Sequence, residues 1–341
     1  MLSLILLGIL FIPFALVGGL ALLWKSKRQL IWRWTLWLYL GAIPILFFGI
    51  GPYGMARILT HAGSRPPDLK LTDTPADYGV NFESITFESS DGLHLNGWWI
   101  PPTTKDGVLI CTHGLFRTRV ELLARAMVAA KSGYGVLLYD SRSHGKSEKG
   151  VVSLGCHEAN DVLGAIHYVL NRYEARPAPK IVLMGVSMGA VATLLAAAQS
   201  DQYVAIILDS PFSSIEDTVI DHTWLFFKLP RYPFTPLFLH WFNKFSGCDP
   251  RLVDSHLALK HLLPVPMLFI GSEGDRRIGP DIARHLYQES DSPSKRIKIF
   301  GKDVGHGAAY RLHPDDYAAV LVDFLDHALA NGTSGAAAGA H

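Results

Sequence analysis

A serine between two glycines is the first group in this sequence that could do chemistry. Ser187 lies in GVSMG (185–189), after the apolar run KIVLMG and before the helix-forming stretch SMGAVATLLAAAQS. A strand that turns into a helix through one residue strains the backbone there, and bulky residues two positions away would collide, which favours glycine at both. Such a turn presents the hydroxyl at a helix N-terminus, where negative charge is stabilised. The pattern predicts a nucleophile; an idle serine in a tight turn is the alternative.

A nucleophilic serine needs a histidine base, and the base needs an acid that fixes its tautomer. His306 stands between two glycines after the last predicted strand, in IKIFGKDVGHGAAY. Asp275 follows a buried apolar run in MLFIGSEGDRRIGP, and Asp209, at the end of YVAIILD, is the second candidate acid. We favour Asp275 because its loop has the longer reach that this acid needs, and the chain order serine, aspartate, histidine is typical of one architecture.

Donors for an oxyanion can be proposed on two segments. The backbone N–H of Met188 follows the nucleophile directly. His113-Gly114, after the run VLICT, would let the chain turn so that the N–H of Leu115 points inward, although an ordinary strand-end turn explains the same pair. We interpret His144, in DSRSHGKS, as a structural residue near the mouth of the site.

A metal site is weakly indicated at one place only. His157 and Asp161 have the i, i+4 spacing of ligands on one helix face, but the segment lacks a third ligand and does not read HExxH. We therefore predict neither a metal nor another cofactor.

Alternating strand and helix patterns must position these groups. FESITFE and LHLNGWWI alternate in polarity on either side of Asp91-Gly92, which predicts a hairpin. Short apolar runs typical of strands buried on both faces then alternate with helical stretches as far as PDDYAAVLVDFLDHALA. This alternation predicts an α/β fold over residues 81–330, with a mostly parallel sheet covered on both faces. Side chains from different strands converge at the C-terminal ends of such a sheet.

Seven short motifs carry a family resemblance. They are HG at 113–114, DSRSHGKS at 140–147, LGCHEANDV at 154–162, GVSMGA at 185–190, DSPF at 209–212, GSEGD at 271–275 and GHG at 305–307. With them, the region from about Phe82 to Leu329 resembles the α/β-hydrolase superfamily, most closely its Bem46-like and serine-aminopeptidase-like branch. The motifs are specific for the fold and much less so for the substrate.

The resemblance implies roles for five residues. Ser187, Asp275 and His306 would form the catalytic triad, and the N–H groups of Leu115 and Met188 would form the oxyanion hole. The chain departs from many relatives directly after HG, because Leu115 is followed by a phenylalanine and an arginine where they have small or amide side chains.

Substrate preference must come from an insertion at about 213–262, between DSPF and LPVPMLF, which is dense in aromatic residues. It could consist of helices that pack on the core, since aromatic residues at helical spacing usually do so. It could also be an apolar lid over an acyl-chain pocket that touches a bilayer. The candidate pocket and lid residues are His113, Phe116, Phe212, Trp224, Phe227 and Ile278.

Two uncharged apolar stretches, 1–24 and 34–56, begin the chain. Each exceeds the roughly 20 residues that a helix needs to cross a bilayer. They predict a transmembrane hairpin over 1–56 and a linker over 57–80; a secretory signal and a buried core helix are the rival interpretations. Basic residues favour the cytoplasmic side, which places the catalytic domain outside the cytoplasm, in the periplasm of a bacterium. These basic residues, in and after the connector, stand at 25, 27, 28 and 33.

Composition adds three limits. With 31 Lys+Arg and 30 Asp+Glu, the 341-residue chain has no basic surplus, so we predict no nucleic-acid partner. Residues 331–341 have nothing to bury and are predicted to be disordered. The three cysteines, with no CxxC, predict no disulfide framework and leave Cys156–Cys248 as the single pair that could form outside the cytoplasm.

The combined prediction is a membrane-anchored serine hydrolase. It would cleave carboxylic esters or thioesters, small or lipid-like and with medium or long acyl chains, through an acyl-enzyme. Two alternatives stay open: a peptidase or amidase that uses the same residues, and a catalytically inactive membrane scaffold. The sequence does not define an oligomeric state.

Overall fold

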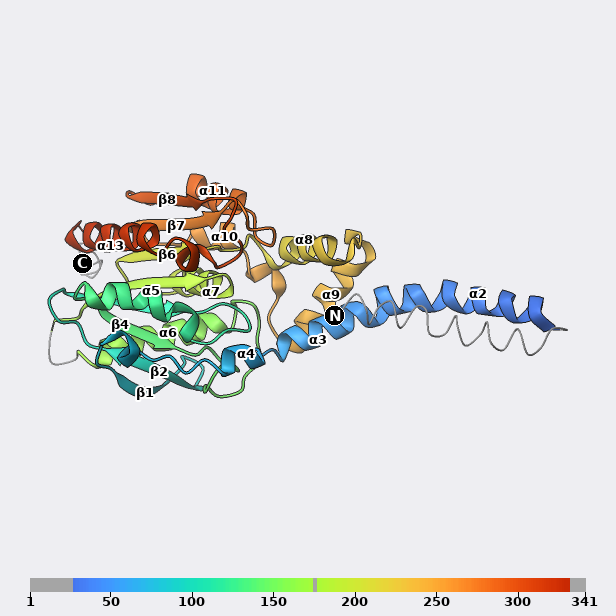
Figure 1. Ribbon diagram of the computed structural model, residues 1–341, viewed down its shortest axis with the longest axis horizontal. Helices are drawn as coiled ribbons and strands as arrows, with labels where there is room; N and C mark the ends of the chain where they lie inside the picture. Colours follow the sequence, from blue (N-terminus) through green and yellow to red (C-terminus); the bar gives the residue numbers. More distant parts are fainter. Residues whose placement is uncertain (1–26, 174–176, 332–341) are drawn as a thin grey trace, which may run out of the picture.

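One eight-stranded sheet forms the centre of the molecule (Figure 1). The computed structural model describes residues 27–173 and 177–331. The strand order is β1-β2-β4-β3-β5-β6-β7-β8; β2 is antiparallel to both of its neighbours, and the remaining pairs are parallel. The strands are β1 (Glu83–Glu88), β2 (His94–Ile100), β3 (Gly107–Thr112), β4 (Gly135–Tyr139), β5 (Lys180–Val186), β6 (Ala205–Asp209), β7 (Met267–Ser272) and β8 (Lys295–Phe300).

The central strands are buried on both faces, as their unbroken apolar runs predict. In β3, Leu109 and Cys111 pack on one side of the sheet, and Val108 and Ile110 pack on the other. Helices α5 and α13 cover the first side, while α6, α7, α10 and α11 cover the second. Their bounds are α5 (Val120–Lys131), α6 (Glu158–Asn171), α7 (Met188–Ala197), α10 (Ser255–Leu259), α11 (Pro280–Glu289) and α13 (Pro314–Asn331), with the short α12 (Ala309–Leu312) before α13.

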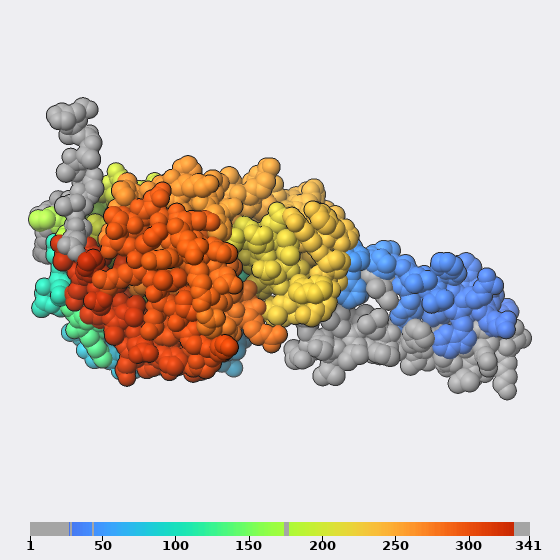
Figure 2. All heavy atoms as spheres, turned by 90° about the horizontal axis from the view of Figure 1, so that it is seen from above, coloured from blue at the N-terminus to red at the C-terminus, as the bar shows by residue number. Residues whose placement is uncertain are grey.

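The aromatic insertion between β6 and β7 forms helices at one end of the sheet. It contains α8 (Ile215–Phe227), α9 (Arg231–Ser246), the 3₁₀ turn η4 (Pro250–Leu252) and α10. Figure 2 shows its yellow part between the red and orange C-terminal part of the domain and the blue N-terminal helix. A disulfide joins Cys248, after α9, to Cys156, before α6. The single pair left open by the sequence is therefore formed, and Cys111 is a buried free thiol.

A long apolar helix projects from the domain at its N-terminal side (Figure 1). It is continuous from Gln29 to Thr60 and is long and apolar enough to cross a membrane. Its outer part is largely exposed; Trp34, for example, is 68% exposed. The first predicted span lies outside the described residues, so the structure gives one candidate span and not the predicted hairpin. The helix consists of α2 (Arg28–Pro44), the π-helical turn η2 (Ile45–Ile50) and α3 (Gly51–Thr60).

The last part of this helix, α3, packs against the insertion. Tyr53 makes edge-to-face contacts with Trp241 and Phe245 of α9, and Ala56 is fully buried. The segment predicted as a linker then forms α4 (Pro66–Leu69) and the 3₁₀ turn η3 (Pro75–Tyr78) before the sheet begins. The predicted tail lies, except for its first residue, outside the described residues.

Candidate active site

Ser187 occupies the strained turn that its flanking glycines predict. It lies between β5 and α7 with φ 55° and ψ −118°, a conformation unusual for a residue with a side chain. A Cβ atom at Gly185 would lie 2.2 Å from the carbonyl oxygen of Gly189, and one at Gly189 would lie 2.2 Å from that of Thr112. Both positions therefore require glycine, and the turn holds the serine hydroxyl at the N-terminus of α7.

A hydrogen-bonded relay connects this hydroxyl to a buried carboxylate. His306 Nε2 lies 2.9 Å from Ser187 Oγ, and His306 Nδ1 lies 2.6 Å from Asp275 Oδ2. The carboxylate can only accept, so Nδ1 carries the hydrogen and Nε2 is left to accept the serine O–H. Asp275 Oδ1 accepts the N–H groups of Arg277 and Ile278 at 2.9 and 3.0 Å, which fixes the carboxylate. The arrangement can withdraw a proton from Ser187.

The second candidate acid has other partners. Asp209 is buried at the end of β6, where it accepts the Tyr317 hydroxyl at 2.8 Å and lies 3.7 Å from the guanidinium of Arg125. The carboxylate of Asp209 is thus part of a buried polar cluster, while that of Asp275 bonds to His306. Of the two candidate acids, Asp275 is therefore the one that contacts the histidine.

The two predicted oxyanion donors are unused. In the described part of the chain, neither the Leu115 N–H nor the Met188 N–H donates a hydrogen bond. The N–H groups on either side of Leu115, those of Gly114 and Phe116, both donate to side chains. The Leu115 N–H is therefore available as a donor in this loop, and Met188 adjoins the nucleophile.

Two buried histidines, His113 and His144, lie against that loop. The Phe116 N–H donates to His144 Nε2 at 3.2 Å, and His144 Nδ1–H donates to the Arg142 carbonyl at 2.8 Å. Burial, and secondly the neighbouring His113, lowers the pKa of His144 to about 3. His113 packs against it with ring centroids 5.1 Å apart and accepts the Ser141 N–H. His144 thus positions the loop that carries Leu115.

An apolar cavity of about 230 Å³, here called the inner cavity, adjoins Ser187. Four of the six predicted pocket residues line it: Phe116, Phe212, Phe227 and Ile278. The other two do not. His113 is buried beneath the loop, and Trp224 lies on α8 with 57% of its surface exposed.

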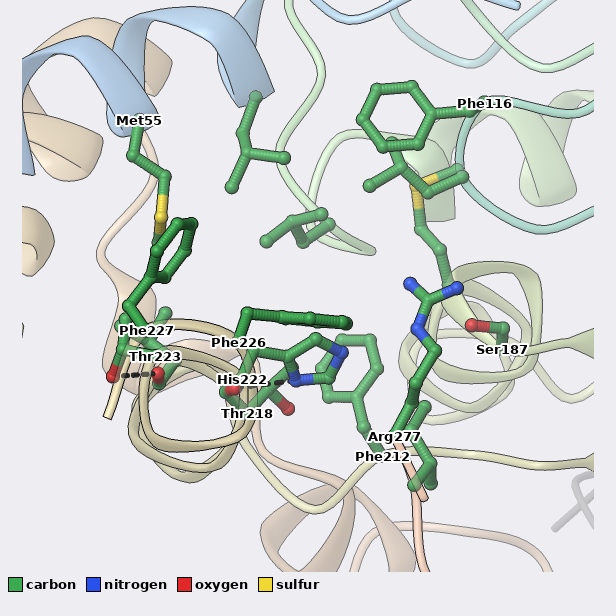
Figure 3. Close-up of a pocket in the computed structure, with 16 residues that line it drawn as sticks. Met55, Phe116, Ser187, Phe212, Thr218, His222, Thr223, Phe226, Phe227 and Arg277 are labelled. Atoms are coloured by element: carbon green, nitrogen blue, oxygen red, sulfur yellow. Dashed lines mark hydrogen bonds between the residues drawn. The ribbon is translucent and has the colours of Figure 1, made fainter. Parts of the chain in front are cut away.

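Several lining residues carry no signal in the sequence. Met55 and Leu59 come from the N-terminal helix; Met55 lies in the stretch that predicts only a membrane span, and Leu59 lies in the predicted linker. His222 and Arg277 are polar, and Figure 3 shows the Arg277 guanidinium on the Ser187 side of the cavity, opposite Phe227. Only the packing of distant elements brings these residues together, although Arg277 stands two residues after the predicted acid.

His222 is one of the few polar groups in the mostly apolar wall of the inner cavity. Its Nδ1–H donates to the Thr218 carbonyl at 2.8 Å, which leaves Nε2 as an acceptor. Burial, and secondly the positive charge of Arg277, lowers the pKa of the imidazole. His222 can therefore accept a hydrogen bond from a bound molecule near the relay.

The two residues with metal-ligand spacing, His157 and Asp161, are both bound to other protein groups. His157 Nε2 lies 2.8 Å from the Ser246 carbonyl, and Asp161 binds the guanidinium and backbone N–H of Arg142. Among the described residues, no cluster of three or more His, Cys, Asp or Glu side chains could hold a metal ion.

The model of an α/β hydrolase family matches residues 108–320, from β3 into α13. The chain belongs to the α/β hydrolase family. The match includes Ser187, Asp275 and His306, and it is to the family as a whole, so the Bem46-like branch stays a prediction.

Individual relatives agree with the family. YqkD of Bacillus subtilis is 26% identical over 299 residues, which is 85% of this chain and 96% of YqkD. The membrane protein YNL320W of Saccharomyces cerevisiae is 25% identical over 261 residues, covering 74% of this chain and 82% of its own. The structure of esterase Pf2001 of Pyrococcus furiosus superposes with a TM-score of 0.65 at 22% identity, covering 78% of this chain and 98% of the esterase. This last likeness shows the fold.

Proposed function

We propose that this α/β hydrolase is a membrane-anchored serine hydrolase that cleaves carboxylic esters or thioesters with medium or long acyl chains. The observation that carries the proposal is the Asp275–His306–Ser187 relay at the edge of an apolar cavity. The esterase named among the similar structures supports the same class of reaction.

The relay defines a two-step acyl transfer. His306 Nε2 takes the hydroxyl proton as Ser187 Oγ bonds to the acyl carbon, and the Asp275 carboxylate stabilises the resulting imidazolium. The N–H groups of Leu115 and Met188 bind the oxyanion. His306 then gives its proton to the departing alcohol or thiol. Water, deprotonated by His306, attacks the acyl-enzyme; the bond from the acyl carbon to Ser187 Oγ then breaks, the acid leaves, and His306 returns the proton to Oγ.

The walls of the inner cavity favour a hydrocarbon substrate. Four phenylalanines, Phe116, Phe212, Phe226 and Phe227, line this cavity together with aliphatic side chains, and an acyl chain that enters it gains free energy by leaving water. In this role α8, which carries Phe226 and Phe227, acts as the lid that the aromatic insertion predicted.

Membrane anchoring and location outside the cytoplasm are the second part of the proposal. The exposed apolar helix from Gln29 to Thr60 supports the anchor, as does the membrane relative in yeast. The Cys156–Cys248 disulfide supports an oxidising compartment, where such bonds persist. The basic residues near the start of the helix indicate the same orientation.

Labelling by a fluorophosphonate probe tests the nucleophile. Ser187→Ala should abolish labelling and ester hydrolysis without a change in the circular dichroism spectrum. Ser200→Ala, just past the other end of α7, is the matched control and should label like the wild type. Full labelling of Ser187→Ala would disprove the assignment, and a wild-type protein that never labels would favour the inactive scaffold.

The class of substrate requires a separate comparison. On p-nitrophenyl esters from butyrate to palmitate, we expect kcat/KM to rise with chain length, because each methylene buried from water contributes about 0.8 kcal/mol. Aminoacyl anilides should be poor substrates. The reverse preference, for anilides over every ester, would instead support the peptidase alternative.

A further inference from the structure

A second apolar cavity, of about 400 Å³, lies between the N-terminal helix and the insertion. We call it the outer cavity. The helix contributes Leu46, Ile50, Gly54 and Ile58 to its wall. The insertion contributes Leu229, between α8 and α9, and Phe234 on α9. No titratable side chain lines it among the residues that the structure describes.

The outer and inner cavities share part of their walls. Met55 and Leu59 of α3 and Phe227 of α8 line both. Figure 3 shows Met55 and Phe227 at the end of the inner cavity that is opposite Ser187. These three side chains thus form the partition between the space beside the nucleophile and the space beside the apolar helix. None of the three is branched at Cβ, so each can change rotamer without moving the backbone.

We propose that the two cavities form one acyl-chain site, in which the carbonyl binds at Ser187 and the distal part of a long chain passes Met55, Leu59 and Phe227 into the outer cavity. The outer half of the site is then built by the membrane helix itself. The substrate class is a long-chain acyl ester or thioester that resides in a membrane. This inference rests on the proposed function and specifies its substrate.

The distribution of polar groups favours a hydrocarbon chain as the occupant. Polar and charged lining groups, including His222 and Arg277, are found around the inner cavity, close to Ser187 where a carbonyl and leaving group would lie. The outer cavity is bounded by apolar side chains and glycines. Its helical wall belongs to the candidate membrane span, the helix from Gln29 to Thr60, so a lipid chain could enter without crossing water.

Gly54 allows this site to be filled selectively. It lines the outer cavity and not the inner one, and a Cβ atom there would meet no atom within 4 Å. Gly41, on α2 of the same apolar helix, also has open space at its Cβ but lines neither cavity. Gly54→Phe and Gly41→Phe are therefore matched substitutions, and Gly54→Leu provides a smaller filling of the same space.

The experiment compares p-nitrophenyl butyrate and palmitate on the full-length protein in detergent micelles. For Gly54→Phe we expect kcat/KM on palmitate to fall by at least about tenfold, because each methylene excluded from an apolar site costs roughly fourfold in affinity. Butyrate hydrolysis and labelling by a short-chain fluorophosphonate should stay within about twofold of wild type. Gly54→Leu should give an intermediate loss, and Gly41→Phe should leave both esters unchanged.

Two outcomes would overturn the inference while leaving the proposed function intact. Unchanged palmitate hydrolysis in Gly54→Phe would mean that the outer cavity has another occupant, such as the predicted first span of the chain. An equal loss on butyrate and palmitate, with reduced labelling, would mean that the substitution damages the site generally. A wild type that neither labels nor cleaves either ester would refute the proposed function, and the inference with it.

Discussion

Both carboxylate oxygens of Asp275 are engaged, one by His306 and the other by the N–H groups of Arg277 and Ile278. An amide in its place would keep the two backbone bonds only by turning its NH₂ toward the imidazole, which would impose the tautomer that cannot accept the serine proton. For Asp275→Asn we expect kcat on an ester to fall by about 10³ to 10⁴, with an unfolding temperature close to wild type.

Asp209→Asn is the informative comparison for that prediction. Asp209 bonds to Tyr317 and neighbours Arg125 inside the domain, so its loss should lower the unfolding temperature. The folded fraction should keep most of its kcat. If Asp209→Asn abolished hydrolysis in a folded protein while Asp275→Asn stayed active, the acid would have to be reassigned.

His144 makes the stability of the domain sensitive to acid. The pKa of its imidazole is about 3 in the folded protein and about 6.5 in the unfolded chain, so only the unfolded state takes up a proton between these values. The stabilisation is complete above about pH 6.5 and is lost progressively as the pH falls toward 3, at roughly 1.4 kcal/mol per pH unit. Between about pH 7 and pH 5, the wild type should lose roughly 2 kcal/mol more free energy of unfolding than His144→Gln.

Urea unfolding at the two pH values, followed by tryptophan fluorescence, measures this difference. Glutamine keeps an acceptor for the Phe116 N–H but does not titrate. His222, whose pKa is also lowered, contributes equally to both proteins and cancels in the comparison. Equal acid sensitivity of wild type and variant would show that His144 does not carry the effect.

The sequence allowed the relay to be predicted because each member follows a strand and has local constraints. Ser187 needs two glycines for steric reasons that are visible in the spacing alone. His222 and Met55 could not be predicted as site residues, because they reach the cavity only through the docking of α8 and α3. Loop length alone favours Asp275 over Asp209 in the sequence. The structure adds a contact that the sequence does not reveal, because the hydroxyl that binds Asp209 belongs to Tyr317, more than a hundred residues away.

At the scale of elements, the segment after α3 clamps the loop that carries Leu115. The Arg65 N–H donates to the Phe116 carbonyl at 2.9 Å, and Asp68 of α4 binds the side chains of both Arg65 and Arg117 at 2.8 Å. The Ser64 hydroxyl donates to the Arg117 carbonyl at 2.6 Å. A stretch that was predicted as a linker thus holds the candidate oxyanion donor in position.

Asp68→Asn tests this clamp. The carboxylate is buried, but its two arginine partners are partly exposed, so we expect a modest loss of about 1 kcal/mol in stability. We also expect a roughly tenfold lower kcat with little change in KM, because the oxyanion contact acts mainly in the transition state. Asp73→Asn, on an exposed position of the same segment, is the control. Identical kinetics of the two variants would indicate that the clamp has no catalytic effect.

The regular elements could be predicted and the docking of the N-terminal helix could not. The alternating pattern of β1 and β2 is typical of strands with one covered face, and the continuous apolar runs of the central strands are typical of burial on both faces. In α3, by contrast, the buried residues Pro52, Ala56 and Thr60 are not large apolar side chains, so nothing in the sequence marks them as a packing face. The buried residue Ala56 looks like any other member of a membrane span.

At the scale of the whole molecule, the insertion and the N-terminal helix each bear on the compartment in which the domain lies. Residues Cys156 and Cys248 are 92 positions apart, and their bond ties α9, on which the N-terminal apolar helix packs, to the region before α6. Such a bond persists in an oxidising compartment and is rare in the cytoplasm. The proposal that the domain lies outside the cytoplasm has an independent second argument in the basic residues near the start of the apolar helix. Both arguments would fail together if the orientation were reversed.

Two measurements on the protein produced in bacterial cells can therefore test the orientation. A phosphatase that is active only in the periplasm, fused to the C-terminus, should be active. Maleimide added to the protein after denaturation should modify only Cys111 before reduction and all three cysteines after it, because Cys156 and Cys248 are bonded. Cys156→Ser is the control, since it should release the thiol of Cys248 without a reductant. A silent phosphatase together with three reactive thiols before reduction would place the domain in the cytoplasm, where an acyl chain would have to enter the site from the inner leaflet.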